Sequence, residues 1–215
     1  MSIARVLRIA DVGVEVAARE AAQALADGGL VVMPTDTVYG LAASLEHPCA
    51  IEAIFRAKDR PADMPLPVLV ASVGEAEALV PGELEAHEEL LNRCWPGALT
   101  VIVGASQKVP REVTAGGDTV GLREPDSDVA RAILHAAGGA LAVTSANISG
   151  APPACDAEEL PDELLQHVAL LVDAGRCAGG TASTVLDLSS APPRVLREGP
   201  VGVDELRRML PDLEC

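Results

Sequence analysis

Residues 30–42 read Leu-Val-Val-Met-Pro-Thr-Asp-Thr-Val-Tyr-Gly-Leu-Ala, and they are the most informative stretch of the chain. Its apolar part, residues 30–33, predicts a buried strand, which the following proline ends because proline has no N–H to donate to a sheet. Two threonines, an aspartate and a tyrosine follow, and Gly40 then permits a turn or a close approach of the backbone. Polar groups at the carboxyl end of a buried strand are typical of α/β ligand sites. The alternative is an ordinary loop in which Asp36 and Thr37 cap a turn.

The composition is that of a globular chain with a large acidic excess. Hydrophobic residues make up 49% of the 215 residues, which excludes a disordered chain, and no apolar run approaches the ~18 residues of a membrane span. The net charge of −16 disfavours a general nucleic-acid-binding surface, which needs clustered lysines and arginines. Five cysteines without a C-x-x-C pair indicate neither zinc nor a disulfide framework, so we expect a reducing, cytoplasmic location.

Lysine is rare in this chain, and one lysine lies beside an arginine in a predicted loop. Fourteen arginines stand against only two lysines, Lys58 and Lys108. Lys58 and Arg60 follow a predicted helix, where an ammonium and a bidentate guanidinium can grip one polyphosphate. The alternative is a solvated helix end whose cations complement the helix dipole.

Strands and helices alternate along the chain. Apolar periodicity predicts helices over 14–26, 49–57, 83–94, 126–137 and 203–209, and strands at 30–33, 66–70, 99–103, 119–123, 141–143, near 170, 183–188 and 195–196. This alternation predicts an α/β fold with a mixed sheet, in one domain over residues 1–215 whose motif-bearing core covers about 14–200. The first predicted strand is followed by no G-x-G-x-x-G, and the chain holds no Walker-type G-x-x-x-x-G-K-[ST].

One predicted strand carries its polar groups on a single face. Strand alternation places Thr119, Gly121 and Arg123 together. A hydroxyl, a bare backbone and a guanidinium suit a carboxylate or phosphate ligand better than they suit a hydrophobic core. The alternative for Arg123 is a structural ion pair with Glu124 or Asp126.

Further hydroxyl-rich segments adjoin two other strands. The strand at 141–143 opens into Thr-Ser-Ala-Asn, so Ser145 and Asn147 can surround an anion with short side chains and backbone donors. No histidine lies nearby in sequence and there is no G-x-S-x-G elbow, so Ser145 is a ligand-binding candidate and not a nucleophile. Ser183 enters a later strand after two glycines, and Arg197 lies close to a third. A pocket of this kind, with neither a metal cage nor a covalent nucleophile, would catalyse by positioning and charge neutralisation.

Seven segments resemble, in the same order, the successive motifs of the YrdC-like family. They are Pro-Thr-Asp-Thr-Val-Tyr-Gly-Leu (34–41), Lys-Asp-Arg-Pro (58–61), Trp-Pro-Gly-Ala-Leu-Thr (95–100), Val-Gly-Leu-Arg-Glu-Pro (120–125), Thr-Ser-Ala-Asn-Ile-Ser-Gly (144–150), Ser-Thr-Val-Leu-Asp-Leu (183–188) and Leu-Arg-Glu-Gly (196–199). The resemblance implies a twisted mixed sheet with surrounding helices and a concave, positively lined cavity. In length the chain resembles the short form, without an extra C-terminal domain.

The resemblance also implies an activity, L-threonylcarbamoyladenylate synthase, which is a nucleotidyltransferase. L-threonine, bicarbonate and ATP would give threonylcarbamoyl-AMP and diphosphate, the first step in forming threonylcarbamoyladenosine in tRNA. Mg²⁺ would enter with ATP, and no metal ligand from the protein is implied. Separate tRNA threonylcarbamoyl transferase proteins would receive the product, with weak or no direct tRNA binding by this chain.

The residue roles implied by the motifs divide between two substrates. The ATP-binding residues would be Lys58, Arg60, Thr119, Ser145, Asn147 and Arg197, and the threonine-binding residues would be Thr35, Arg123 and Ser183. Lys58 and Arg60 would also act in catalysis, by neutralising charge on the triphosphate. Asp36 would orient the amine or Mg²⁺, or else cap a turn.

Two departures from the family pattern bear on the substrate. Asp59 stands where the family often has glycine, and Leu69 stands where many members have histidine. If that histidine helps to hold threonine, this chain must hold it in another way. An enzyme with a different acceptor is therefore one alternative. The other is an RNA-binding module of the same fold, because YrdC-like domains have been regarded as RNA-binding, but the net charge of −16 disfavours it.

Overall fold

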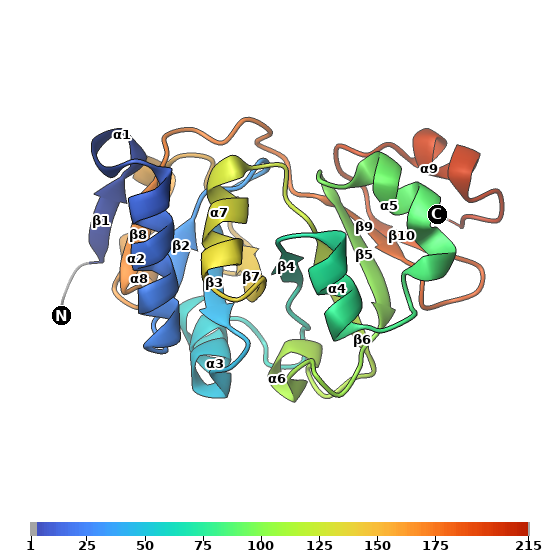
Figure 1. The fold of residues 1–215 in the computed structure, drawn as a ribbon, viewed down its shortest axis with the longest axis horizontal. Helices are drawn as coiled ribbons and strands as arrows, with labels where there is room; N and C mark the ends of the chain where they lie inside the picture. Colours follow the sequence, from blue (N-terminus) through green and yellow to red (C-terminus); the bar gives the residue numbers. More distant parts are fainter. Residues whose placement is uncertain (1–3, 215) are drawn as a thin grey trace.

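One mixed β-sheet runs through residues 4–214, which the computed structural model describes (Figure 1). Its strands are β1 (Arg5–Arg8), β2 (Val31–Met33), β3 (Gly40–Ser44), β4 (Val68–Val70), β5 (Leu99–Gly104), β6 (Thr119–Arg123), β7 (Ala140–Ser145), β8 (Leu170–Asp173), β9 (Thr184–Asp187) and β10 (Arg194–Arg197). They lie in the order β1-β8-β2-β3-β7-β4-β6-β5-β9-β10. Parallel pairs such as β4 with β6 stand beside antiparallel pairs such as β3 with β7, so the predicted α/β class with a mixed sheet is confirmed.

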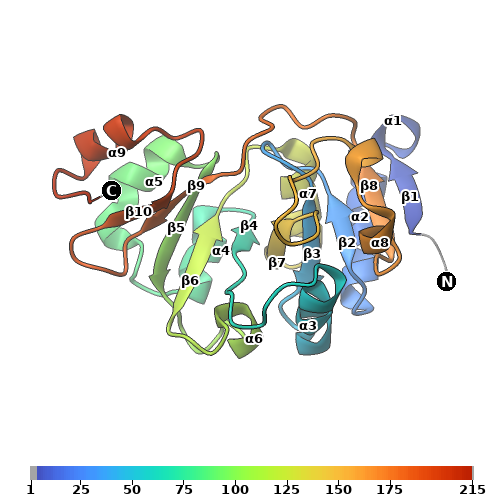
Figure 2. The same cartoon turned by 180° about the vertical axis from the view of Figure 1, so that it is seen from behind.

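Helices cover both faces of this sheet. They are α1 (Ile9–Val12), α2 (Val14–Ala26), α3 (Pro48–Ala57), α4 (Val73–Leu79), α5 (Glu88–Cys94), α6 (Arg111–Thr114), α7 (Asp128–Ala136), α8 (Asp162–Leu165) and α9 (Val203–Met209), with 3₁₀ turns at Glu85–His87 and Ala157–Glu159. Helices α2 and α7 lie together on one face (Figure 1), and α3 and α8 lie on the other (Figure 2). Among residues 4–214, no helix is both long and apolar enough to cross a membrane.

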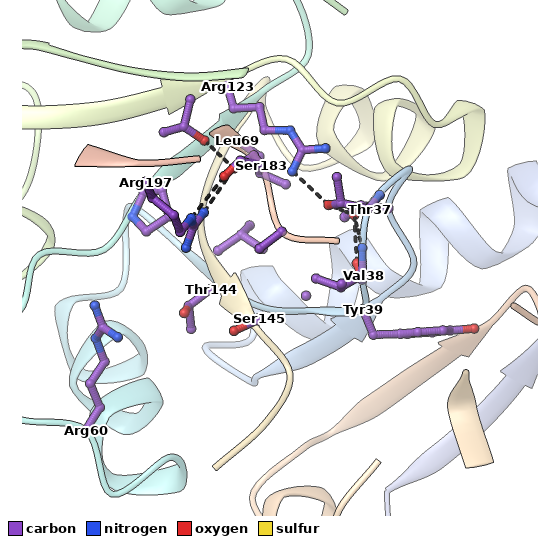
Figure 3. A pocket seen from close by; sticks show the side chains of 16 residues that line it. Thr37, Val38, Tyr39, Arg60, Leu69, Arg123, Thr144, Ser145, Ser183 and Arg197 are labelled. Carbon is purple, nitrogen blue, oxygen red and sulfur yellow. Dashed lines mark hydrogen bonds between the residues drawn. The ribbon is translucent and has the colours of Figure 1, made fainter. Parts of the chain in front are cut away.

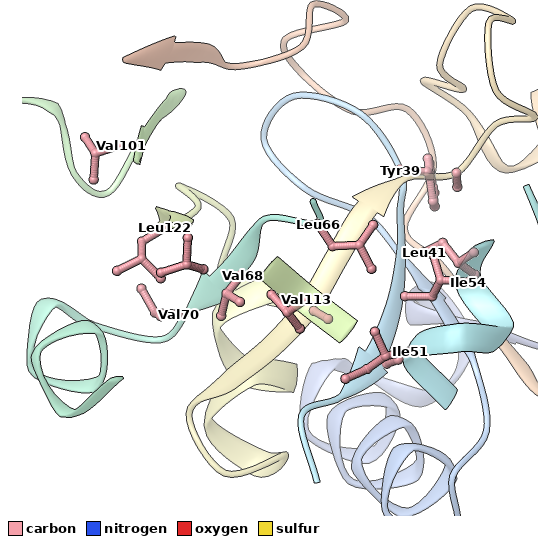
Figure 4. Close-up of a cluster of buried hydrophobic side chains, with 14 of the residues drawn as sticks. Tyr39, Leu41, Ile51, Ile54, Leu66, Val68, Val70, Val101, Val113 and Leu122 are labelled. Atoms are coloured by element: carbon pink, nitrogen blue, oxygen red, sulfur yellow. The ribbon is translucent and has the colours of Figure 1, made fainter. Parts of the chain in front are cut away.

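The sheet packs into an apolar cluster on each face. In β2, Val31 and Met33 belong to the cluster beneath α2 and α7, whereas Val32 belongs to the larger cluster on the opposite face. Helix α2 presents Ala21 and Leu25 to the first cluster, as helical periodicity predicts. Figure 4 shows part of the larger cluster, in which β3, β4, β5 and β6 meet α3 and α6. Because both faces are covered, β2 is a continuous apolar run and not an alternating one.

Three parts of the sheet differ from the sequence prediction, and the first of them is strand β1, which the sequence prediction does not contain. The sequence does not predict β3, because its residues Gly-Leu-Ala-Ala-Ser have low strand propensity, although all of them are buried. A Cβ at Gly40 would lie 2.6 Å from Val143 Cγ1, so this glycine serves a close approach to β7 and not a turn. The strand predicted at 66–70 is shorter in the structure, where β4 begins at Val68, because Pro67 has no N–H for the ladder.

The connection from β8 to β9, residues 174–183, is here called the crossover. Since β8 is second in the strand order and β9 is ninth, the crossover runs along one end of the sheet past the strands between them (Figure 1). Its backbone donates hydrogen bonds to the loop between β2 and β3, residues 34–39. The crossover therefore joins the two halves of the sheet at the end where that loop lies.

The two edges of the sheet carry the same tetrapeptide, Arg-Val-Leu-Arg. Within the described part of the chain, β1 pairs with β8 alone, and β10 pairs with β9 at the opposite edge. Both strands expose an apolar side chain, Val6 at 46% and Leu196 at 58%. Charged residues on an edge strand discourage pairing with other chains, and each edge has two arginines.

Candidate active site

Two cavities adjoin one another, and the first of them lies beside the crossover and the loop between β2 and β3. Figure 3 shows the side chains that line this first cavity. The first has a volume of about 190 Å³ and is lined by Thr35, Thr37, Val38, Tyr39, Gly40, Arg60, Pro67, Leu69, Thr100, Arg123, Val143, Thr144, Ser145, Ala182, Ser183 and Arg197. The second has a volume of about 240 Å³ and is lined by Arg60, Pro65, Leu66, Pro67, Thr100, Ile102, Thr119, Gly121, Ser183, Val185 and Arg197. Because they share five lining residues, one ligand can extend from the first cavity into the second.

Most residues predicted to bind substrate line these cavities. They are Thr35, Arg123 and Ser145 in the first, Thr119 in the second, and Arg60, Ser183 and Arg197 in both. Three of them are arginines, which give the cavities the positive lining that the sequence predicts. The other two predicted residues, Lys58 and Asn147, are buried and line neither cavity.

Thr35 organises the loop that follows β2. Its hydroxyl accepts hydrogen bonds from the backbone N–H of Thr37 at 3.1 Å and of Val38 at 3.2 Å, and it donates to the carbonyl of Val38 at 2.7 Å. Thr35 therefore caps this turn, in place of the Asp36 and Thr37 side chains that the alternative interpretation of the sequence assigns to it. Its hydroxyl also lies 3.0 Å from that of Thr37, so the two threonines form one hydrogen-bonded unit.

Arg123 is the most extensively bonded cation lining the first cavity. Its Nε donates to the carbonyl of Gly97 at 2.8 Å, its Nη1 to the Thr37 hydroxyl at 2.9 Å, and its Nη2 to Asp36 Oδ1 at 2.5 Å. Figure 3 shows the guanidinium reaching toward Thr37. Burial lowers the pKa of Arg123 and the Asp36 carboxylate opposes that shift, but a guanidinium keeps its charge near neutral pH.

The ion pair of Arg123 differs from the one considered in the sequence. Asp36, which comes from the loop after β2, replaces Glu124 and Asp126 as the partner. Glu124 is instead buried next to Arg123 in the chain, and burial raises the pKa of its carboxyl. The guanidinium has five N–H donors, and the described residues accept three hydrogen bonds from it, so two donors are left for a ligand.

Ser183 and two further arginines connect the cavities. The Ser183 hydroxyl lies 2.8 Å from that of Thr100 and accepts from Arg197 Nη2 at 3.2 Å, while Arg197 Nε donates to the Ser183 carbonyl at 3.0 Å. Arg60 is held in a similar way, because its Nη2 donates to the carbonyl of Pro65 at 2.9 Å. Both guanidiniums are therefore oriented by backbone carbonyls while they line the two cavities.

Lys58 lies behind the first cavity and is only 2% exposed. Its ammonium donates to the carbonyl of Ser145, to the carbonyl of Asn147 at 2.5 Å and to Asn147 Oδ1 at 3.3 Å. The Asn147 amide nitrogen in turn donates to the carbonyls of Ile148 and Ala151 at 2.9 and 2.7 Å. Burial, with the charge of Arg60 as a lesser cause, lowers the pKa of Lys58 to about 8. The structure thus places Lys58 where it holds the segment after β7, and its direct contact with ATP stays a prediction.

Three residues of the site have no role in the sequence prediction. Thr37, Thr100 and Thr144 line the first cavity, and Thr37 is a direct partner of Arg123. Each lies inside a segment that the sequence singles out, so the signal is present. What the sequence lacks is the pairing between segments that decides which hydroxyl of each segment faces the cavity.

Comparison with known proteins identifies the family of the chain. A family model named for Sua5, YciO and YrdC, with the description telomere recombination, matches residues 23–199. The chain belongs to the Sua5/YciO/YrdC family. The YrdC-like resemblance of its seven sequence segments is therefore confirmed.

Relatives within the Sua5/YciO/YrdC family are named for one activity. The threonylcarbamoyl-AMP synthase of Pyrococcus abyssi is 37% identical over 195 residues, which cover 91% of this chain and 57% of that protein. A Mycobacterium tuberculosis protein named provisionally for the same activity is 43% identical over 187 residues, with coverage of 87% and 86%. The crystal structure of P. abyssi Sua5 complexed with L-threonine matches with a TM-score of 0.89 at 35% identity, and covers 99% of this chain and 63% of that one. The chain thus spans less than two thirds of the Pyrococcus protein.

Proposed function

We propose that this protein is an L-threonylcarbamoyladenylate synthase, which converts L-threonine, bicarbonate and ATP into threonylcarbamoyl-AMP and diphosphate. The observation that carries the proposal is the buried Arg123 guanidinium, which lines a cavity of hydroxyl groups and keeps two N–H donors without a partner among residues 4–214. A fixed guanidinium suits a carboxylate because it can donate two parallel hydrogen bonds. The threonine complex of the Pyrococcus relative supports an amino acid as the ligand.

In this proposal threonine binds in the first cavity. Arg123 pairs with its carboxylate, Ser183 offers a hydroxyl, and Thr35 fixes the loop that carries the partners of Arg123. Leu69, which replaces the family histidine, is buried and lines the same cavity beside Val143. An apolar wall at this point suits the methyl group of threonine and needs no hydrogen bond.

ATP extends through the shared residues into the second cavity. Arg60 and Arg197 line both cavities and face the triphosphate, with Thr119 on one side and Ser145 on the other. Lys58 and Asn147 support the Ser145 segment from behind, and the charge of Lys58 helps Arg60 to neutralise the leaving diphosphate. Mg²⁺ enters with ATP as part of that substrate.

The chemistry requires positioning more than covalent catalysis. The threonine amine attacks the carbon of CO₂ derived from bicarbonate and loses a proton, which gives a carbamate. A carbamate oxygen then attacks the α-phosphorus in line, the bond from that phosphorus to the oxygen bridging to the β-phosphorus breaks, and diphosphate leaves. Fixed cations stabilise the charge on the leaving group, and a buried cavity protects the labile carbamate from water.

The product is a mixed anhydride that a second protein must use. We place the enzyme in the cytoplasm, where separate tRNA threonylcarbamoyl transferase proteins would accept the product. Direct tRNA binding by this chain would be weak, because a net charge of −16 repels a polyanion.

The proposal is tested by measuring diphosphate release from MgATP by the full chain. We expect release only when both L-threonine and bicarbonate are present, and we expect D-threonine to be a poor substitute because its groups cannot meet Arg123 and the apolar wall together. Release that is unchanged when threonine is omitted, or no release with all substrates present, would refute the assignment.

A further inference from the structure

The crossover lies directly against the loop that carries the partners of Arg123. The backbone N–H of Gly179 donates to the carbonyl of Asp36 at 2.9 Å, and that of Gly180 donates to the carbonyl of Thr37 at 2.8 Å. These are the two residues whose side chains accept hydrogen bonds from Arg123 Nη2 and Nη1. The crossover thus holds the backbone of the residues that orient the guanidinium.

Further hydrogen bonds attach the crossover, and the loop itself, to neighbouring segments. The hydroxyl of Tyr39, at the far end of the same loop, donates to the carbonyl of Gly175 at 2.6 Å. The N–H of Cys177 donates to the carbonyl of Cys155 at 2.7 Å, and the N–H of Tyr39 donates to the carbonyl of Ala154 at 2.9 Å. The loop between β2 and β3 is therefore enclosed by the crossover on one side and by residues 154–155 on another.

Gly179 is the point of closest approach. A Cβ at this position would lie 2.6 Å from the carbonyl oxygen of Asp36 and 3.2 Å from Thr37 Cα. Both of these are backbone atoms, so no flexible side chain can move aside to make room. The φ angle of Gly179 is not in the left-handed region, in contrast to Gly180 with a φ of +72°. Glycine is therefore required at position 179 because there is no room for a side chain, and not because of the backbone conformation.

We propose that Gly179 is a positioning residue for the amino-acid substrate: its missing side chain lets the crossover press the Asp36–Thr37 backbone into the place where both side chains meet Arg123. A larger residue at 179 would push this backbone away and change the direction of the guanidinium. This inference rests on the proposed function, because it assigns Arg123 to the threonine carboxylate.

The residues that line each cavity predict which substrate would bind more weakly if the loop between β2 and β3 were displaced. The first cavity is lined by Thr35, Thr37, Val38, Tyr39 and Gly40, whereas none of residues 35–40 lines the second. A displaced loop should therefore weaken threonine binding and leave the ATP contacts in the second cavity in place. A merely structural role for Gly179 would affect both substrates alike.

The experiment compares Gly179→Ala with Gly202→Ala in the full chain. Gly202 is a matched control, because it too has an ordinary backbone conformation (φ −72°), but a Cβ at this position would meet no atom within 4 Å. We expect Gly179→Ala to raise the KM for threonine by roughly 10–100-fold, as misplacement of a positioned group by about 1 Å can do, with little change in the KM for ATP. Gly202→Ala should resemble the wild type in both.

A second measurement separates this inference from the proposed function. Hydrogen exchange of a peptide covering residues 35–39 should be faster in Gly179→Ala than in Gly202→Ala, whatever the substrate is. Equal exchange in the two variants, or an equal rise in both KM values for Gly179→Ala, would overturn the positioning role. A wild-type protein that shows no threonine dependence would refute the proposed function, and with it the assignment of Gly179 to the amino-acid substrate, even if the exchange of the loop changed.

Discussion

Replacing Asp36 by asparagine tests whether the buried ion pair of the site stabilises the fold. Arg123 Nη2 donates to Asp36 Oδ1 at 2.5 Å, and the two side chains are only 6% and 14% exposed. Asparagine has the same shape and keeps one acceptor oxygen, but it carries no charge. The substitution therefore removes the electrostatic part of the interaction and leaves the packing unchanged.

The expected loss of stability follows from the charge of Asp36, which asparagine does not carry. A hydrogen bond to a charged group contributes about 1.5–3 kcal/mol and a neutral one about 0.5–1.5, so the bond itself loses about 1–1.5 kcal/mol. Removing one partner of a fully buried ion pair costs about 3–5 kcal/mol, because the other charge is left without compensation. Asp36 keeps some solvent contact, so we expect the free energy of unfolding to fall by about 2–3 kcal/mol, which lowers Tm by roughly 4–12 °C in a chain of this size.

Urea titration followed by tryptophan fluorescence measures this loss, because Trp95 is the single tryptophan and is buried. Glu20→Gln is the matched control. Glu20 forms an ion pair with Arg5 at 3.0 Å, but the side chains are 34% and 62% exposed, so its loss should be about 0–1 kcal/mol. If Asp36→Asn loses no more free energy than Glu20→Gln, the pair contributes nothing beyond a surface contact and our reasoning is wrong.

Four further outcomes are expected. Lys58→Met removes the ammonium that donates to three oxygens of Ser145 and Asn147, so it should raise the KM for ATP, while Lys108→Met on the exposed surface should not. Equal effects of the two substitutions would mean that the buried Lys58 does not support ATP binding. Burial lowers the pKa of Lys58 from 10.5 to about 8, so between these two pH values the unfolded chain binds more protons than the folded chain. The free energy of unfolding of the wild type, relative to that of Lys58→Met, should therefore rise with pH by up to roughly 1.4 kcal/mol per pH unit. Urea titrations that give the same difference in free energy between the two proteins at pH 8 and at pH 9.5 would contradict this. Arg123→Ala should raise the KM for threonine far more than that for ATP, and an equal rise would mean that Arg123 only supports the cavity. In a gel-shift titration at physiological salt, tRNA should bind weakly and be displaced by ATP, whereas tight binding that survives saturating ATP would favour the RNA-binding alternative.

The sequence predicts much of the fold because, in a long segment, the spacing of apolar residues shows whether the segment is a helix or a strand. Helix α2 has the predicted bounds, and so does strand β6, in which alternation places polar and apolar residues on opposite faces. Several short elements are not predicted. Strand β3 consists of small residues that become strand only because β2 and β7 bond to both sides of it, and helices α1, α6 and α8 have four residues each, too few for a period to show.

The sequence predicts most of the residues that form the site, but only in part which of them form hydrogen bonds with one another. Motif resemblance identifies Arg123 and Ser183, and both line the first cavity. The pairing of Arg123 with Asp36 joins segments 87 positions apart in sequence, and no local pattern contains that information. The same holds for Gly179, since a glycine required by space looks in sequence like a glycine required by a turn.

The edge strands have a consequence for synthesis of the chain. Strand β1 emerges from the ribosome first, yet its partner β8 lies at Leu170–Asp173, so at ~5–20 residues per second roughly 8–30 s pass before the two can pair. During that time the Val-Leu pair of β1 is an unpaired apolar strand that other nascent chains can meet. The arginines on either side, Arg5 and Arg8, act as charged gatekeepers against such encounters. The residues that protect an edge in the finished sheet therefore also protect β1 during the interval before β8 has been synthesised.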